Sequence, residues 1–77
     1  MKINVKIFGQ LVEITGTDNL SFDNIQDTDQ LMERLHSLFP SLREASFACA
    51  VNLRIIRTNT HLLDNSMVAL LPPFSGG

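Results

Sequence analysis

Residues Asp27–Pro40, DTDQLMERLHSLFP, decide the fold because they form the one stretch with a clear helical period. Asp27 or Thr28 can accept hydrogen bonds from the first free backbone N–H groups, and Asp29 places negative charge at the positive end of the helix dipole. Pro40 ends the segment, because the residue before a proline disfavours helical angles. Apolar residues recur at i, i+4, i+7 and i+8, and they predict one buried stripe: Leu31, Leu35, Leu38 and Phe39.

Five short segments on either side of this helix have the composition of β-strands. In residues 2–8, polar and apolar residues alternate, which places Ile3, Val5 and Ile7 on one face of a half-buried strand. Residues 47–51 are apolar throughout, so we expect an interior strand that is covered on both faces. The remaining segments are bounded by residues typical of turns: 20–22, 54–56 and 67–71.

The expected order of elements is β-β-α-β-β-β, with one main helix across a mixed sheet. A helix between the second and third strands needs a crossover connection, and we expect the first and last strands to lie side by side. We therefore predict an α+β two-layer sandwich with the β-grasp, or ubiquitin-like, arrangement. Residues 1–71 would form the domain, and residues 72–77 an extended C-terminal tail.

The tail Leu71–Gly77, LPPFSGG, has the composition of a projecting segment. Its two prolines hold φ near about −65° and favour extended polyproline geometry. Its two final glycines narrow the end of the chain and can adopt backbone angles that other residues avoid. At roughly 3.3 Å per residue, the residues after Leu71 can carry the terminal carboxylate about 20 Å from the core.

Composition and charge limit the classes of function. The chain has 77 residues, of which 44% are hydrophobic, and this suffices for one small core. Six Lys and Arg residues against eight Asp and Glu residues give a formal net charge of −2. The basic residues are dispersed from Lys2 to Arg57, so we expect no nucleic-acid partner. The longest apolar runs, Phe47–Val51 and Met67–Leu71, are far below the roughly 20 residues of a membrane span, and we expect a cytoplasmic protein with no membrane partner.

The sequence contains no convincing metal or catalytic cluster. Cys49 is the only cysteine and lies in an apolar segment, where a buried structural thiol is the ordinary expectation. His36 lies in the expected helix and His61 in a loop, and neither has a neighbouring ligand in the sequence. We therefore expect this chain to bind no metal and no cofactor.

Four stretches resemble the ubiquitin-like sulfur-carrier family, and within it the small subunits of molybdopterin synthase. Residues 7–16, IFGQLVEITG, are similar to the family's first strand and the segment after it. Residues 50–52, AVN, resemble its Ala-Val-Asn turn, and residues 63–69, LDNSMVA, stand where an acidic turn leads into the last strand. Residues 72–77, PPFSGG, are the most specific stretch, and the resemblance covers essentially the whole chain.

Three positions differ from the family pattern. Asn65-Ser66 replaces the usual Gly-Asp of the acidic turn, Val12 stands where arginine is frequent, and Phe74 is larger than the common valine. Because asparagine tolerates the left-handed backbone region, we expect the turn to survive the first change.

The resemblance implies a non-catalytic carrier subunit. It implies that an ATP-dependent adenylating enzyme activates Gly77, and that a sulfur donor protein then supplies the sulfur of a thiocarboxylate. It also implies that the large subunit of molybdopterin synthase binds the tail, carries the catalytic groups for sulfur transfer to a pterin precursor, and forms a heterotetramer with this chain. The candidate site residues are Gly77 for the chemistry, Gly76 and Ser75 for tail insertion, and Phe74, Pro73, Pro72, Leu71 and Phe8 for partner binding.

The residues leave several alternatives open. A sulfur carrier for thiazole formation in thiamine synthesis shares the fold and the two glycines, although the Pro-Pro and Ala-Val-Asn segments favour the molybdopterin branch. A ubiquitin-like protein modifier, attached through Gly77 to lysines, requires the same adenylation. A pure binding module would leave Gly77 idle. Finally, Phe8, Leu70 and Leu71 form an exposed apolar patch on the sheet or pack in the core.

Overall fold

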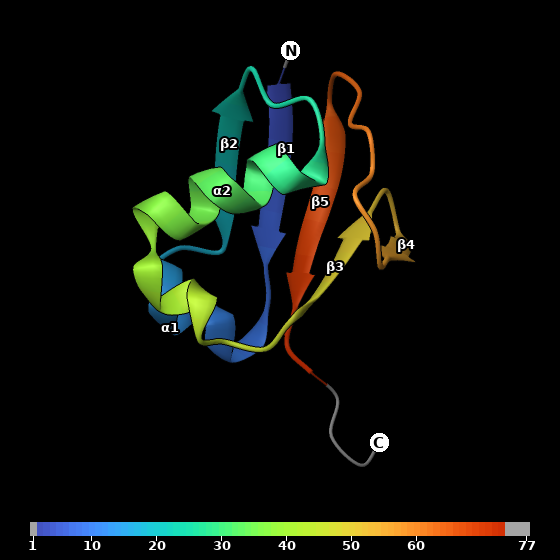
Figure 1. Cartoon of the computed structure of the whole chain (residues 1–77). Helices are drawn as coiled ribbons and strands as arrows, with labels where there is room; N and C mark the ends of the chain where they lie inside the picture. Colours follow the sequence, from blue (N-terminus) through green and yellow to red (C-terminus); the bar gives the residue numbers. More distant parts are fainter. Residues whose placement is uncertain (1, 74–77) are drawn as a thin grey trace.

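A mixed five-stranded sheet forms one layer of the fold, and a helix lies across one of its faces as the second layer (Figure 1). The computed structural model describes residues 2–73. The strands are β1 (Lys2–Ile7), β2 (Asn19–Asp23), β3 (Ala48–Val51), β4 (Arg54–Ile56) and β5 (Ser66–Leu71). The helices are α1 (Val12–Thr15) and α2 (Thr28–Leu38), with two short 3-10 helices, η1 (Gly9–Leu11) and η2 (Pro40–Arg43).

The strands follow the order β2-β1-β5-β3-β4 across the sheet. β1 and β5 pair in parallel at the centre, and the other three pairs are antiparallel. The prediction that the first and last strands lie side by side is therefore confirmed, and with it the β-grasp arrangement. The prediction of an extended tail falls largely on residues 74–77, which lie outside the described residues.

The core lies between α2 and the sheet face that α2 covers. The alternation predicted for β1 is confirmed, since Ile3, Val5 and Ile7 are at most 2% exposed. Val68 and Leu70 of the neighbouring β5 reach the same layer and are fully buried. Because side chains alternate across a strand, the intervening residues of β1 and β5 lie on the opposite, open face of the sheet.

The start of α2 is fixed from two directions. Asp27 caps it as predicted, because its carboxylate accepts a hydrogen bond from the backbone N–H of Gln30 at 2.9 Å. Asn59, in the loop before β5, accepts hydrogen bonds from the backbone N–H of Asp29 at 2.9 Å and from the Thr28 hydroxyl at 3.2 Å. A segment distant in sequence therefore shares in the capping, which the local pattern around the helix did not indicate.

The end of α2 departs from the predicted apolar stripe. Leu31 and Leu35 are fully buried as expected, but the prediction for Leu38 is wrong because 53% of its surface is exposed. The helix ends at Leu38, and Phe39 already has the non-helical φ of −131°. Leu42 of η2 is only 1% exposed and fills the core beyond the end of the helix. The turn that follows α2 therefore provides the apolar contact expected of Leu38.

The turn before β5 survives its unusual sequence, as expected. Asn65 adopts a φ of 66°, in the left-handed region that asparagine tolerates. Its backbone N–H donates to the Lys2 carbonyl at 2.7 Å, while the Lys2 N–H donates to the Asp64 carboxylate at 2.7 Å. These bonds join the start of β1 to the start of β5.

The interior position predicted for residues 47–51 is confirmed, because β3 pairs with both β5 and β4. The expectation that both faces of this strand are covered holds only in part, since Ala50 and Val51 are buried whereas Ala48 and Cys49 are partly exposed. α2 covers one face of the sheet only, and Ala50 on the other face lines a surface depression. The apolar composition of the strand thus serves two different surfaces.

We predict that Leu35→Ala lowers the free energy of unfolding by about 2–5 kcal/mol, because it leaves a cavity in the packed layer between α2 and the sheet. The matched control, Leu38→Ala on the same helix, should change it by less than about 1 kcal/mol because most of this side chain is exposed. Urea unfolding followed by circular dichroism measures both. Equal losses for the two variants would contradict the packing described for α2.

Candidate functional site

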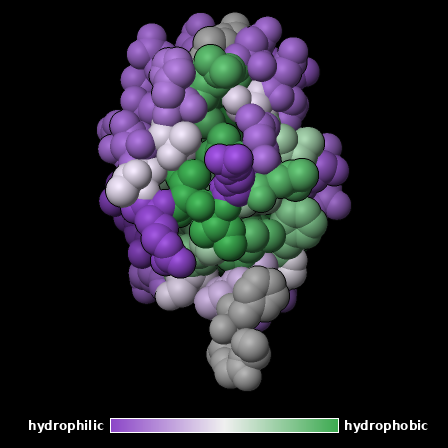
Figure 2. Space-filling model, turned by 90° about the vertical axis from the view of Figure 1, so that its right-hand side faces the viewer, coloured by the Kyte–Doolittle hydropathy of each residue, from purple (hydrophilic) through white to green (hydrophobic). Residues whose placement is uncertain are grey.

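A shallow depression on the open face of the sheet adjoins the strand that leads into the tail. Its floor follows from the strand register: Lys6 of β1 lies beside Ala69 of β5, which lies beside Ala50 of β3, which lies beside Ile55 of β4. Because the two central residues are alanines, this row is hollow in the middle, and a cavity of about 330 Å³ results. Figure 2 shows this face as a largely hydrophobic area around a hydrophilic side chain.

We call this feature the docking depression. It is lined by Lys6, Phe8, Ala50, Leu53, Ile55, Met67, Ala69 and Leu71. Four of these carry the most exposed apolar surface: Phe8 (45%), Met67 (40%), Ile55 (58%) and Leu53 (97%). A concave apolar surface of this kind is typical of a protein-interaction site.

The three residues for which an exposed patch and core packing were both left open divide between the depression and the core. Phe8 and Leu71 both line the depression, where they are available to a partner. Leu70 is fully buried, so the core alternative holds for this residue. The partner-binding roles of Phe8 and Leu71 remain predictions.

Most of the residues that line the depression were not among the predicted site residues. Met67, Ala69 and Leu71 alternate with buried residues of β5, so an apolar side chain at every open-face position was the available signal. The contribution of Ala50 and Ile55 depends on the register between strands, which the local sequence does not contain.

The hairpin between β3 and β4 places an apolar side chain at the rim of the depression in a strained conformation. Asn52 and Leu53 have φ values of 48° and 73°. Asn52 tolerates this region and is held by Met67, whose carbonyl accepts from the Asn52 N–H at 2.8 Å and whose N–H donates to the Asn52 side chain at 2.9 Å. Leucine gains no such compensation, and a left-handed conformation costs it roughly 1–2 kcal/mol. An exposed, strained leucine beside an apolar depression is typical of a functional position.

The body of the protein fixes the base of the tail. Leu71 still pairs with Ala48 of β3, and the backbone N–H of Phe8 donates to the Leu70 carbonyl at 3.1 Å. Beyond β5, Pro72 is half-buried and Pro73 exposed. Gly9 has a φ of 59°, and a Cβ atom there would lie only 2.9 Å from Pro72 Cγ, so a glycine lets the two segments approach closely. The tail therefore leaves the sheet at the edge of the docking depression.

The predicted residues of the tail itself lie beyond the described part of the chain. These are Phe74, Ser75, Gly76 and Gly77. Their roles in partner binding, tail insertion and chemistry remain predictions.

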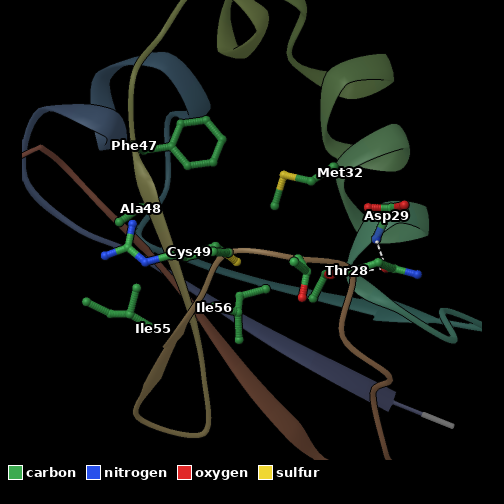
Figure 3. A pocket seen from close by; sticks show the side chains of 11 residues that line it. Thr28, Asp29, Met32, Phe47, Ala48, Cys49, Ile55 and Ile56 are labelled. Carbon is green, nitrogen blue, oxygen red and sulfur yellow. Dashed lines mark hydrogen bonds between the residues drawn. The ribbon is translucent and has the colours of Figure 1, made fainter.

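A second cavity, of about 450 Å³, lies between the start of α2 and strands β3 and β4. Figure 3 shows Met32 of α2 facing Phe47, Cys49 and Ile56 across it. Cys49 is half-buried, and burial raises the pKa of its thiol from 9.0 to about 11. The thiol is therefore protonated at neutral pH, which favours the predicted structural role over a nucleophilic one.

Neither a metal-binding cluster nor a membrane-spanning helix is found among the described residues. Within residues 2–73, no three His, Cys, Asp or Glu side chains gather closely enough to hold a metal ion. No helix in the same part of the chain is both long and apolar enough to cross a membrane.

We predict that Leu53→Gly raises the free energy of unfolding by roughly 0.5–1 kcal/mol, because glycine adopts the left-handed conformation without strain. The control is Leu63→Gly, at another exposed leucine whose φ is not positive, where added backbone freedom should lower stability. Urea denaturation measures both variants. A loss of stability in Leu53→Gly would contradict the strain assigned to the hairpin.

We predict that iodoacetamide alkylates Cys49 in the native chain at pH 8 about 100-fold more slowly than in the urea-unfolded chain, since raising the pKa from 9.0 to about 11 reduces the thiolate by that factor. The same shift has a consequence for stability. The unfolded thiol ionises first, so the stability contributed by Cys49 is present below pH 9 and is lost as the pH rises towards 11. Equal alkylation rates would show that the thiol is not shielded.

The sequence and fold match a known family. The ThiS family model matches residues 5–77. A chain in the protein–protein complex of subunits 1 and 2 of molybdopterin-converting factor from Helicobacter pylori 26695 is 29% identical, with a TM-score of 0.77 and complete coverage of both chains. No curated protein sequence matches the chain significantly.

Archaeal structures share the same fold. The solution structure of small archaeal modifier protein 1 (SAMP1) from Methanosarcina acetivorans is 25% identical with a TM-score of 0.84, covering 99% of this chain and 96% of that one. The crystal structure of SAMP1 from Haloferax volcanii is 21% identical with a TM-score of 0.81 over the whole of both chains, and it supports the fold alone. The predicted resemblance to ubiquitin-like sulfur carriers is confirmed, and the chain belongs to the ThiS family.

Proposed function

We propose that the chain is the sulfur-carrier subunit of a molybdopterin synthase, and that its Gly77 carboxylate is adenylated and converted into a thiocarboxylate. The observation that carries the proposal is the apolar docking depression at the base of the tail, in a chain of the ThiS family. The 29% identity to a chain of the Helicobacter pylori subunit 1–subunit 2 complex supports a larger subunit as the partner. The cytoplasm is the compartment we propose for this function.

The chemistry of the tail requires a second protein. An α-carboxylate has a pKa of about 3.3–3.7, so at neutral pH it is ionised and is a poor electrophile. In the proposed activation, a carboxylate oxygen of Gly77 attacks the α-phosphorus of ATP and pyrophosphate leaves. A sulfide equivalent from a sulfur donor protein then attacks the carbonyl carbon, AMP leaves, and a thiocarboxylate remains.

The proposed division of labour places binding on this chain and catalysis on the large subunit. The docking depression contains a single ionisable side chain, Lys6, and the thiol in the second cavity is protonated at neutral pH. The depression would hold the large subunit while Gly76 and Ser75 enter its site and Phe74 contacts its surface. The large subunit would supply the acid, base and oxyanion-binding groups, and this chain would supply the position of the sulfur.

A second candidate function is favoured by the 25% identity to small archaeal modifier protein 1 from Methanosarcina acetivorans. A protein modifier would use the same adenylated Gly77 but would transfer it to lysine side chains. Lysine-linked conjugates in cells, without a thiocarboxylate species, would establish this alternative. Identifying the genes that neighbour this one would distinguish a carrier for thiamine synthesis from both.

We predict that incubation with an adenylating enzyme, ATP and a sulfur donor raises the intact mass of the chain by one sulfur-for-oxygen exchange. Tandem mass spectrometry should place the exchange at Gly77. The control variant lacks Gly76 and Gly77, and it should keep the thermal stability of the full chain because the described core lies within residues 2–73. An unchanged mass of the full chain, with ATP consumed and the other proteins active, would contradict the proposed function.

A further inference from the structure

Lys6 is the only charged residue among those that line the docking depression; the others are apolar. Its position is fixed by the register of β1, which places it beside Ala69, one of the two alanines of the floor. The methyl group of Ala69 is too small to separate the aliphatic part of the Lys6 side chain from the docking depression. The ammonium group of Lys6 therefore lies within reach of any surface that covers the depression. Lys6 is exposed in the described chain and is hydrated while the depression is open.

A protein that covers the depression removes water from this ammonium group. A buried charge without a partner strongly opposes binding, whereas a carboxylate at hydrogen-bond distance compensates for the lost hydration. None of the other residues that line the depression has an acceptor side chain, and Asn19, which lies beside Lys6 on β2, carries a neutral amide. The compensating negative charge must therefore come from the partner.

We infer that the partner surface is apolar with one Asp or Glu carboxylate placed against Lys6, and that this ion pair selects the cognate partner. The inference rests on the proposed function, since the occupant is the large subunit of molybdopterin synthase. Leu53, Phe8 and Met67 would fill apolar hollows on that subunit around the ion pair. Charge complementarity at this one position discriminates against apolar surfaces that lack the carboxylate.

The observations favour a protein occupant over a phosphate-rich one. Nucleic acid and anionic membranes are bound by several basic groups together, whereas the depression has one. The net charge of the chain is −2. Leu71 at the rim also continues directly into Pro72, so the protein that receives the tail lies over the depression.

The test is the dissociation constant of the full-length chain and the purified large subunit, measured by isothermal titration calorimetry. Lys6→Met keeps most of the side-chain length and removes the charge. It should weaken binding by at least about 30-fold, because the partner carboxylate loses its counterion inside the interface. Lys6→Glu should weaken binding further. Lys6→Arg keeps the charge and should stay within a few-fold of the natural chain.

The matched control is Lys2→Met, at an exposed lysine on the same strand outside the depression, and it should leave the dissociation constant unchanged. Thermal unfolding of every variant shows whether the fold is kept. Binding by Lys6→Met that equals or exceeds that of the natural chain would overturn the ion pair while leaving the proposed function standing. Failure of the natural chain to bind the large subunit would overturn both.

Discussion

The parallel pairing of β1 with β5 is the contact on which the rest of the structure depends. It joins the two ends of the chain at the centre of the sheet, and it aligns Val5 with Val68 beneath α2. The same register places Lys6 beside Ala69 on the opposite face. One pairing therefore builds the core on one side and the docking depression on the other, and it anchors the base of the tail between β1 and β3.

The two faces of the sheet are apolar for different reasons. Under α2, large side chains such as Ile3 and Leu70 fill the space and stabilise the fold. On the open face, Ala50 and Ala69 leave space unfilled, and the larger apolar residues stand around them. The left-handed Leu53 fits the same interpretation, because exposed residues in strained conformations cluster at binding sites.

The local patterns of the sequence predicted those features that depend on one segment at a time. Alternation in residues 2–8 and the period of residues 27–40 identified β1 and α2, and Asp27 was one of the two candidate caps. The burial of Leu42 in place of Leu38 depends on where the chain turns after the helix, and the capping by Asn59 depends on a loop distant in sequence. The residues that form the floor of the depression could not be predicted in this way, because they come together only through the register of four strands. Resemblance supplied the tail chemistry, because Gly77 has no side chain from which chemistry could be inferred.

We propose that the open face of the sheet, and not the cavity around Cys49, receives the partner. An NMR titration of the methyl-labelled chain with the unlabelled large subunit tests this proposal directly. The chemical shift of each methyl group reports on the face of the sheet on which that methyl group lies. We expect the largest shifts at the methyl groups of Ala50, Ala69 and Met67, which line the docking depression. Met32, in the second cavity, should change little. Large shifts at Met32 with unchanged Ala50 and Ala69 signals would contradict binding of the partner at the open face.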